Sequence, residues 1–455
     1  MTDAISAYLV SYGIALTYDD LPPEVIGRAK QLLIDTLGCG VGGSVSETGR
    51  IVRTVAERVC PQDGCATILG SGRQSTPELA AFANGAMMRY LDCNDGFFAR
   101  GGGGHPSDNF APVLACGEAI HANGKEFLVA SVLAYEVFCR LQDQLDLNSR
   151  GFDQAVIGVI SSALGVSKIL GLSPEQFMQA INLAVAPNIS LLQTRRGEVS
   201  MWKGCAVANA ARNAIFAALL AKEGMSGPSP IFAGRAGFMH AVSGFFQLEK
   251  FGGHGQPFRI MEVSIKRYPC GKFAQTAIDA AIKLRARIPS IDEICRIHIG
   301  TSAQGKNSMA GDAERWHPET RETADHSIPY VVAVALLYGA VEVEHFSDHC
   351  RQDQRLLELI GKITVAETDE CNNLYPEASA NRVDIITAAG ETFSELAQYH
   401  RGHYLNFPTD AEIEEKFHAL AGDVLSRERR QQALAALWNL EQIDDVGKVM
   451  NFFTP

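Results

Sequence analysis

Residues 91–109 read LDCNDGFFARGGGGHPSDN and hold the side chains of a candidate acid–base site. Asp92 and Asp95 are three residues apart, so in a helix they would share one face. Gly101–Gly104 then leave a stretch of bare backbone that a ligand can approach closely, and His105 follows. Carboxylates and an imidazole are the groups that general acid–base catalysis uses. The stretch therefore predicts a proton-transfer site.

The same stretch has a structural alternative, because Ser107 or Asp108 could simply cap the next helix after a flexible joint. In the site interpretation, Asp95 and Ser107 are substrate-binding candidates. Four consecutive glycines cannot order themselves, so we expect the glycine loop to be mobile until a substrate binds.

A second stretch, residues 191–209, places three cations in apolar surroundings. Arg195, Arg196 and Lys203 precede small, apolar residues that predict a helix opening near Lys203. A helix N-terminus attracts anions, so cations beside it favour a substrate with two or three carboxylates. Solvated surface residues are the alternative.

Three further groups of polar residues are less specific. Asp153 directly precedes a predicted apolar helix. It is either a proton-transfer group or only the N-cap of that helix. In residues 266–275, KRYPCGKFAQ, the cations Lys266, Arg267 and Lys272, with Tyr268, could close over an anionic ligand, and Arg267 and Lys272 are the substrate-binding candidates. In WHPETRETADHS, residues 316–327, the polar side chains indicate either an interdomain network or chemistry.

Composition excludes several classes of protein. The 455-residue chain has a net charge of −12, a pI near 5.5 and no long basic run, so nucleic acid and anionic membranes are not expected partners. We see no secretory signal and no apolar run of about 20 residues. The eleven cysteines are an odd number without a C-x-x-C motif, which argues against a disulfide framework and a local zinc site. We expect a cytoplasmic protein with no metal ion or cofactor.

Hydrophobic periodicity predicts the elements that must position these residues. It is helical from residue 3 to about 245, changes to short β-rich segments between helices, and is helical again after about residue 405. The predicted fold is mainly α with an inserted α+β domain. Residues 1–260 and 405–455 would form one discontinuous helical domain, and residues 261–404 a smaller α+β lid domain.

Several motifs resemble those of the MmgE/PrpD family, in order along nearly the whole chain. They are LDCND…GHPSDN at 91–109, RGFDQ at 150–154, SMWKGCAVANAARNA at 200–214, TRETADHSIPY at 320–330 and NFPTDAEIEEKF at 406–417. The resemblance implies a helical domain from both chain ends, a lid domain and a homodimer. It also implies metal-independent chemistry that moves a proton on a carbon beside a carboxylate, as in 2-methylcitrate dehydratase, cis-aconitate decarboxylase and iminodisuccinate epimerase.

The resemblance places family site residues on Asp92, His105 and Lys203. Decarboxylase and epimerase branches carry a histidine at the position of Asp153, and the decarboxylase tyrosine corresponds to Asp312 here. Both differences weigh against a cis-aconitate decarboxylase, whereas the motifs HPSDN and MWKG resemble those of the dehydratase branch.

The sequence therefore predicts a hydro-lyase that acts on a small di- or tricarboxylate such as 2-methylcitrate. His105 would be the acid–base group, tuned by Asp92, with Asp153 as a second proton-transfer group. Lys203 would bind a carboxylate or donate a proton, and Arg195 or Arg196 would clamp another carboxylate. An epimerase or decarboxylase, and a non-catalytic carboxylate-binding homologue, are the alternatives.

Overall fold

The computed structural model describes residues 3–454, and several of its helices begin at a residue whose side chain caps the first turn. The hydroxyl of Ser173 accepts a hydrogen bond from the backbone N–H of Gln176 at the start of one helix. Thr409 and Glu412 form a reciprocal capping box at the start of another. Such caps satisfy backbone N–H groups that have no partner in the first helical turn.

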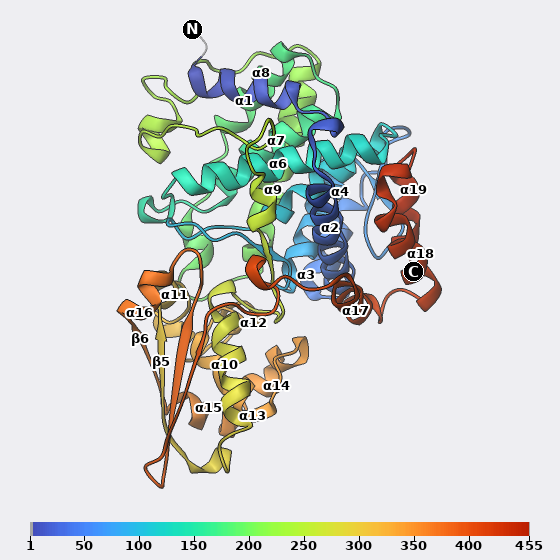
Figure 1. Ribbon diagram of the computed structural model, residues 1–455. Helices are drawn as coiled ribbons and strands as arrows, with labels where there is room; N and C mark the ends of the chain where they lie inside the picture. Colours follow the sequence, from blue (N-terminus) through green and yellow to red (C-terminus); the bar gives the residue numbers. More distant parts are fainter. Residues whose placement is uncertain (1–2, 455) are drawn as a thin grey trace.

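Helices from the first half of the chain and from its end form the upper part of the molecule in Figure 1, called here the helical part (residues 4–265 and 410–453). From the first half come α1 (Ala4–Ala15), α2 (Pro23–Ser44), α3 (Glu47–Ala56), α4 (Pro77–Tyr90), α5 (Phe110–Ala119), α6 (Gly124–Gln144), α7 (Ala155–Ile169), α8 (Pro174–Val185) and α9 (Trp202–Lys222). From the end come α17 (Asp410–Ala421), α18 (Arg427–Trp438) and α19 (Gly447–Met450).

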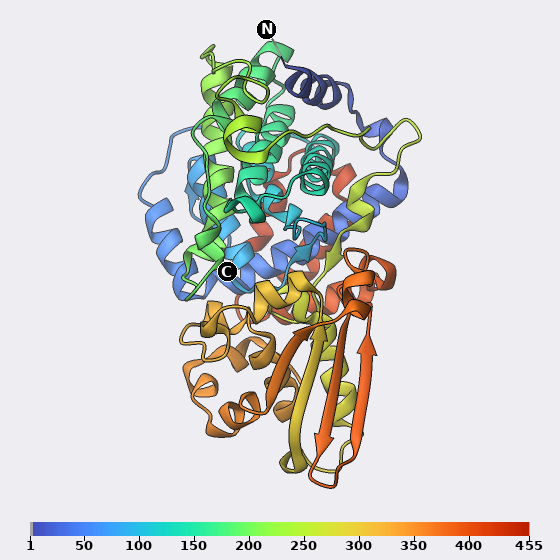
Figure 2. The ribbon, with the colours of Figure 1, turned by 90° about the vertical axis from the view of Figure 1, so that its left-hand side faces the viewer.

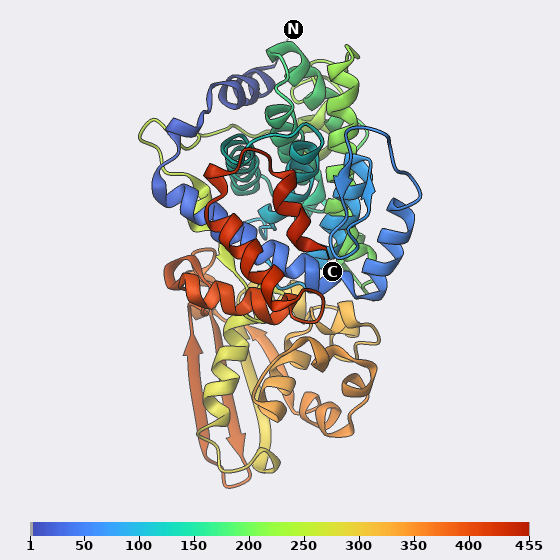
Figure 3. The ribbon, with the colours of Figure 1, turned by 90° about the vertical axis from the view of Figure 1, so that its right-hand side faces the viewer.

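Helix α2 joins the two chain ends, because α4 and α17 both pack on it. Figure 3 shows the C-terminal helices, in red, lying against it. A Cβ atom on Gly42 would lie 2.8 Å from the carbonyl oxygen of Leu420, and one on Gly43 only 2.2 Å from that of Met87. Glycine at these two positions therefore permits the close approach of both neighbouring helices.

The lower part of the molecule, called here the α+β part (residues 266–409), contains a four-stranded sheet with the order β6-β5-β7-β8 (Figure 2). Strand β5 is parallel to β6 and antiparallel to β7, which pairs with β8. The elements are α10 (Gln275–Arg285), β5 (Ile294–Thr301), α11 (Ala303–Met309), α12 (Arg321–Ala324), α13 (Ile328–Tyr338), α14 (Asp348–Arg351), α15 (Gln354–Ile360), β6 (Ile363–Glu367), α16 (Asp369–Leu374), β7 (Asn381–Thr387) and β8 (Thr392–Ala397).

Two-residue strands make two further small sheets. Strand β1 (Ala66–Thr67) pairs with β2 (Gln74–Ser75), and β3 (Asp95–Gly96) pairs with β4 (Ser264–Ile265). Strands β5, β6 and β7 confirm the short β-rich segments that the sequence predicts between the helices of this region.

Buried apolar side chains form two large clusters that follow these parts. One contains residues between Leu9 and Ile265 together with residues from Ile413 to Phe453. The other contains Phe98 and residues between Tyr268 and Ala397. The mainly helical class with a smaller α+β region is thus confirmed, whereas two independent domains remain a prediction.

One helix in residues 3–454, α9, is long and apolar enough to span a membrane by length and composition. Of the relevant window, 67% is buried inside the protein, so α9 is a core helix packed against α4, α7 and α8. Lys203 and Arg212 interrupt its apolar residues, which agrees with the absence of an uninterrupted apolar run in the sequence.

The first apolar cluster contains side chains from both ends of the chain, and this leads to a prediction about stability. Phe417, on α17, is fully buried against α2, whereas Phe245 is 80% exposed. We expect Phe417→Ala to lower the free energy of unfolding by about 3–5 kcal/mol because it leaves a cavity in the shared core. The matched control Phe245→Ala should change it by about 0.5 kcal/mol or less. Chemical denaturation measures both values, and equal small effects would show that the C-terminal helices do not stabilise the helical part.

Candidate active site

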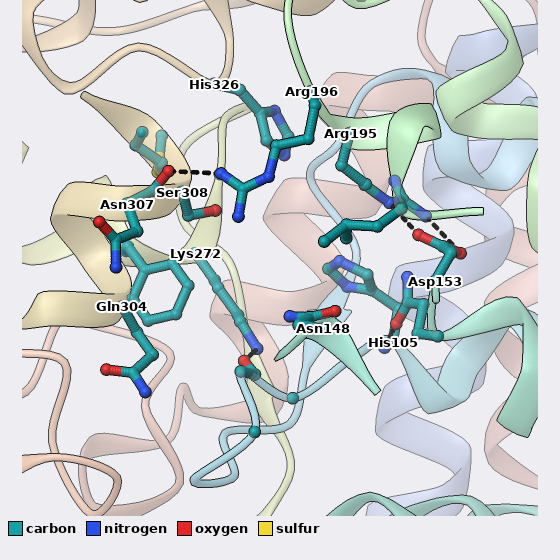
Figure 4. Close-up of a pocket in the computed structure, with 18 of the residues that line it drawn as sticks. His105, Asn148, Asp153, Arg195, Arg196, Lys272, Gln304, Asn307, Ser308 and His326 are labelled. Atoms are coloured by element: carbon teal, nitrogen blue, oxygen red, sulfur yellow. Dashed lines mark hydrogen bonds and ion pairs between the residues drawn. The ribbon is translucent and has the colours of Figure 1, made fainter. Parts of the chain in front are cut away.

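A cavity of about 310 Å³ lies between the helical part and the α+β part (Figure 4), a size that suits a small ligand. Both parts contribute to its lining. The helical part supplies Gly101, Gly102, Gly103, His105, Asp146, Asn148, Ser149, Asp153, Gln154, Leu192, Arg195 and Arg196. The α+β part supplies Lys266, Gly271, Lys272, Phe273, Gln304, Asn307, Ser308, Met309 and His326.

Backbone and lysine hydrogen bonds hold the glycine loop in the conformation seen here, and its mobility before substrate binds stays a prediction. Phe97 and Gly104 exchange two backbone hydrogen bonds of 2.8 and 3.0 Å. The ammonium of Lys272 donates to the carbonyl oxygens of Phe97 and Gly102. Gly103 has a φ of +78°, and a Cβ there would lie 2.0 Å from the Phe97 carbonyl oxygen. The glycines therefore serve a tight turn that lines the cavity.

His105 lies at the end of this loop with its ring held at one nitrogen. Its Nδ1 is 2.6 Å from the carbonyl oxygen of Asp95, which can only accept, so Nδ1 carries the proton. Its backbone N–H donates to Oε1 of Gln154 at 2.9 Å. Burial, reinforced by the nearby charges of Arg89 and Lys266, lowers the pKa of His105 well below its usual value. The imidazole is thus neutral at pH 7, and Nε2 is its basic atom.

The prediction that Asp92 and Asp95 share a helix face is wrong. Helix α4 ends at Tyr90, and Asp92 has a φ of +50°, so the chain leaves the helix before either carboxylate. The carboxylate of Asp92 is fully buried and lies 2.8 Å from the ammonium of Lys266. Although burial raises the pKa of Asp92, the charges of Lys266 and Lys203 hold it well below its usual value.

Asp95 and Ser107 bind each other and do not line the cavity, which corrects their prediction as substrate-binding residues. The Asp95 carboxylate accepts hydrogen bonds from the backbone N–H and the hydroxyl of Ser107 at 3.0 and 2.6 Å. Tyr135 also donates to it, at 3.2 Å. Burial raises the pKa of Asp95 to about 7. The contact with His105 comes from the Asp95 backbone, so Asp95, not Asp92, orients the imidazole.

Arg195 and Arg196 both reach the cavity, but in different ways (Figure 4). Arg195 donates from Nε to Oδ2 of Asp153 at 2.7 Å, and Oδ1 of Asp153 also accepts from the N–H of Ala155 at 2.9 Å. Arg196 donates to the carbonyl oxygen of Asn307 at 2.7 Å, across the cavity. Asp153 is therefore engaged in holding Arg195, which also donates from Nη1 to the carbonyl oxygen of Lys203 at 3.2 Å. Both arginines line the cavity that a ligand would enter.

Lys266 and Lys272 bring two more cations to the cavity. Strand β3 pairs with β4, which places Lys266 beside Asp92. Lys272 precedes α10 and points at the glycine loop. Burial, together with the charge of Lys266, lowers the pKa of Lys272 well below its usual value. An anionic ligand would counteract this repulsion and favour the charged ammonium.

Arg267 was a predicted substrate-binding residue, but its side chain is exposed and does not line the cavity. Successive residues of an extended chain point to opposite sides, so Lys266 faces inward where Arg267 faces solvent. The sequence pattern located the cationic segment, and of its three cations Lys266 and Lys272 line the cavity.

Lys203 opens α9 as predicted, but its ammonium is buried behind the cavity and does not line it. It lies 2.6 Å from Oδ1 of Asp325, which is in the α+β part. The same carboxylate oxygen is 2.6 Å from Nδ1 of His326. Of these three residues, only His326 lines the cavity.

Residues 3–454 contain one group of three side chains with the chemistry of metal ligands, namely Asp92, Asp325 and His326. The ammonium groups of Lys266 and Lys203 already pair with its two carboxylates at 2.8 and 2.6 Å. A divalent cation would have to displace or repel these buried charges, so the group fits an ion-pair network better than a metal site.

The cavity residues that sequence reasoning missed are mostly uncharged, as in Asn148, Gln154 and Gln304. His326 belongs to the segment 316–327, for which the sequence leaves an interdomain network and chemistry equally open. Amides in loops carry no distinctive spacing, so only tertiary structure could select them. The assembled cavity combines a neutral basic imidazole with several cations, which suits proton removal from a polycarboxylate.

Comparison with known proteins agrees with this geometry. The profile of the MmgE/PrpD N-terminal domain matches residues 7–250, and that of the MmgE/PrpD C-terminal domain matches residues 268–440. The second match runs beyond the α+β part into α17 and α18.

Curated relatives match over most of their length. The chain is 30% identical to the 2-methylcitrate dehydratase of Cupriavidus necator, covering 89% of this chain and 85% of that protein. It is 27% identical to the cis-aconitate decarboxylase of Homo sapiens, covering 93% and 89%. It is also 26% identical to a cis-aconitate decarboxylase-like protein of Aspergillus oryzae, covering 98% and 96%. These names are those of lyases and support a lyase-type enzyme here. The two profile matches together show that the chain belongs to the MmgE/PrpD family.

Proposed function

We propose that the protein is a metal-independent hydro-lyase that removes a proton beside a carboxylate of a small di- or tricarboxylate, such as 2-methylcitrate, with loss of water. One observation carries this proposal: a neutral histidine faces a cavity in which cations from both parts of the molecule converge. The named activities of the relatives support the same class of reaction.

In this reaction His105 takes the proton through Nε2, while the Asp95 carbonyl holds Nδ1–H. Removal of the proton puts negative charge on the substrate carboxylate beside the carbanion, and a fixed cation stabilises that charge. Arg195 and Arg196 bind carboxylates through paired N–H donors, which match the two oxygens of each group. Lys266 and Lys272 supply the remaining positive charge.

The roles of Asp92, Asp153 and Lys203 in this proposal are indirect. Asp92 anchors Lys266, and Asp153 fixes Arg195 by a charged hydrogen bond. Lys203 pairs with Asp325 across the two parts. Each holds another charge in place, as expected of residues that preorganise a site.

The proposed assembly is a homodimer, and one apolar surface supports it. Ile189, Leu191 and Trp202 are between 46% and 61% exposed and line one groove on the helical part. Exposed apolar patches on proteins often mark contacts with other chains. The expected cytoplasmic location remains a prediction from sequence.

A first test follows proton transfer directly. The protein is incubated with citrate, 2-methylcitrate or cis-aconitate in D₂O, and NMR detects deuterium on carbon and the formation of products. We expect loss of water from 2-methylcitrate. Epimerisation or loss of CO₂ would instead identify the alternative reactions, and a raised Tm without any exchange or turnover would indicate a protein that only binds carboxylates.

In the same assay, His105→Gln should lower the rate by a factor on the order of 10² to 10⁴, the usual contribution of one acid–base group. The exposed His349 provides a matched control, and His349→Gln should leave the rate unchanged. Full activity of His105→Gln on each carboxylate that the wild type accepts would contradict the assignment of the base.

A second prediction separates Arg196 from Arg267. Arg196→Gln should raise KM by roughly 10- to 100-fold, because a hydrogen bond to a charged group contributes about 1.5–3 kcal/mol. Arg267→Gln should leave KM unchanged, since Arg267 is exposed outside the cavity. Steady-state kinetics measures both, and the assignment fails if the two variants behave alike.

A third prediction concerns metal ions. Exhaustive treatment with EDTA, followed by removal of the chelator, should leave kcat and KM unchanged. The physical reason is that lysine ammonium groups already neutralise the buried carboxylates that could bind a metal. Activity that is lost and then restored by a divalent cation would refute metal independence.

A further inference from the structure

His326 reaches the cavity from the α+β part, while His105 reaches it from the helical part (Figure 4). Its side chain is 14% exposed, and that exposure is toward the cavity that it lines. Asp153, which the sequence suggested as a second proton-transfer group, is held by Arg195 and the N–H of Ala155. The cavity therefore offers a second imidazole where sequence reasoning expected a carboxylate.

The contacts of His326 determine which nitrogen is free. Nδ1 lies 2.6 Å from Oδ1 of Asp325, whose pKa, although raised by burial, is held below its usual value by the adjacent Lys203. An ionised carboxylate accepts hydrogen bonds, so Nδ1 must donate and Nε2 is left for the cavity. A carboxylate behind a histidine fixes its tautomer and stabilises the imidazolium when that forms.

Asp325 is itself held by cations. Lys203 lies 2.6 Å from Oδ1, and Arg321 lies 3.2 Å from Oδ2. Lys203 belongs to α9 and Asp325 to the α+β part, so this ion pair crosses between the two parts. Lys203 is also 3.2 Å from Nδ1 of His326, and Asp92 is 3.6 Å from it.

We propose that His326 is the second proton-transfer residue of the cavity, and that Asp325 and Lys203 are its positioning residues. This inference rests on the proposed lyase function and extends it. The C–H proton first moves to Nε2 of His105 and leaves a carbanion whose charge is spread onto the neighbouring carboxylate. In a second step its electron pair forms the new C=C bond as the C–O bond breaks. The departing hydroxyl takes the proton from Nε2–H of His326 and leaves as water. Solvent then removes the proton from His105 and returns one to His326.

His326 must be protonated to act as the acid, and the negative charge of a bound substrate favours that protonated form. Burial, followed by the charge of Lys203, lowers the pKa of His326 to about 4, whereas the carboxylates of Asp92 and Asp325 act in the opposite direction. Arg196 also lines the cavity near this ring (Figure 4). A bound di- or tricarboxylate adds negative charge, which favours the imidazolium that donates the proton.

The experiment compares proton removal with loss of water in D₂O, using 2-methylcitrate as the probe. The sum of deuterium incorporation and elimination counts proton removals, and elimination alone counts loss of water. For His326→Gln we expect proton removal close to the wild-type rate, with elimination lowered by a factor on the order of 10² to 10⁴. His105→Gln should lose both, and the control His349→Gln neither.

Either of two results would overturn the role of His326. One is elimination at the wild-type rate in His326→Gln, and the other is a parallel loss of proton removal and elimination. If wild-type protein neither exchanges protons nor eliminates water with this probe, the proposed function fails instead, so the two failures are distinguishable.

The positioning residues are tested with a pair of charge-removing changes. Lys203→Met alone leaves the buried Asp325 without its partner and can prevent folding, so it is combined with Asp325→Asn. If both act through His326, adding His326→Gln to this double variant should lower elimination no further. If the triple variant instead loses elimination rate by the product of the two factors measured for His326→Gln and for the double variant, Lys203 and Asp325 do not act through His326. Circular dichroism and the Tm verify that each variant is folded.

Discussion

The cavity depends on charges that are buried between the two apolar clusters. Lys203 and Asp325 form an ion pair of 2.6 Å, and Lys266 and Asp92 form one of 2.8 Å. All four side chains are at most 2% exposed. Removing one partner of such a pair typically destabilises a protein by about 3–5 kcal/mol, whereas the complete pair adds little stability over apolar residues of similar size. These pairs therefore specify one relative placement of the two parts.

That placement brings basic groups together in an acidic molecule. The chain has a net charge of −12, yet Arg195, Arg196, Lys266 and Lys272 line one cavity. Lys266 and Lys272 are buried, so their charges interact more strongly than they would at the surface. Asp153 compensates part of the positive charge through Arg195. The remaining positive charge is suited to a ligand with more than one carboxylate.

Sequence patterns predicted the general region of the site better than the direction of its side chains. The sequence predicts a site in residues 91–109 and in residues 191–209, and both stretches contribute to the cavity lining. Within them, however, the Asp95 carboxylate binds Ser107, and the Lys203 ammonium binds Asp325. A residue type and its spacing indicate available chemistry, but the partner that a buried charge finds lies more than 100 residues away in the case of Lys203.

The sequence by itself determined most of the longer helices, three strands of the larger sheet, the family and the supply of histidines and cations, because these depend on local periodicity, capping and motif order. Only the tertiary structure decided that Lys266 faces the cavity and Arg267 faces solvent. It also decided that His326 joins His105 there, because that meeting requires α9 and the α+β part to come together. The physical reason is that a pairing between distant segments is set by the packing of whole elements, which no local pattern encodes.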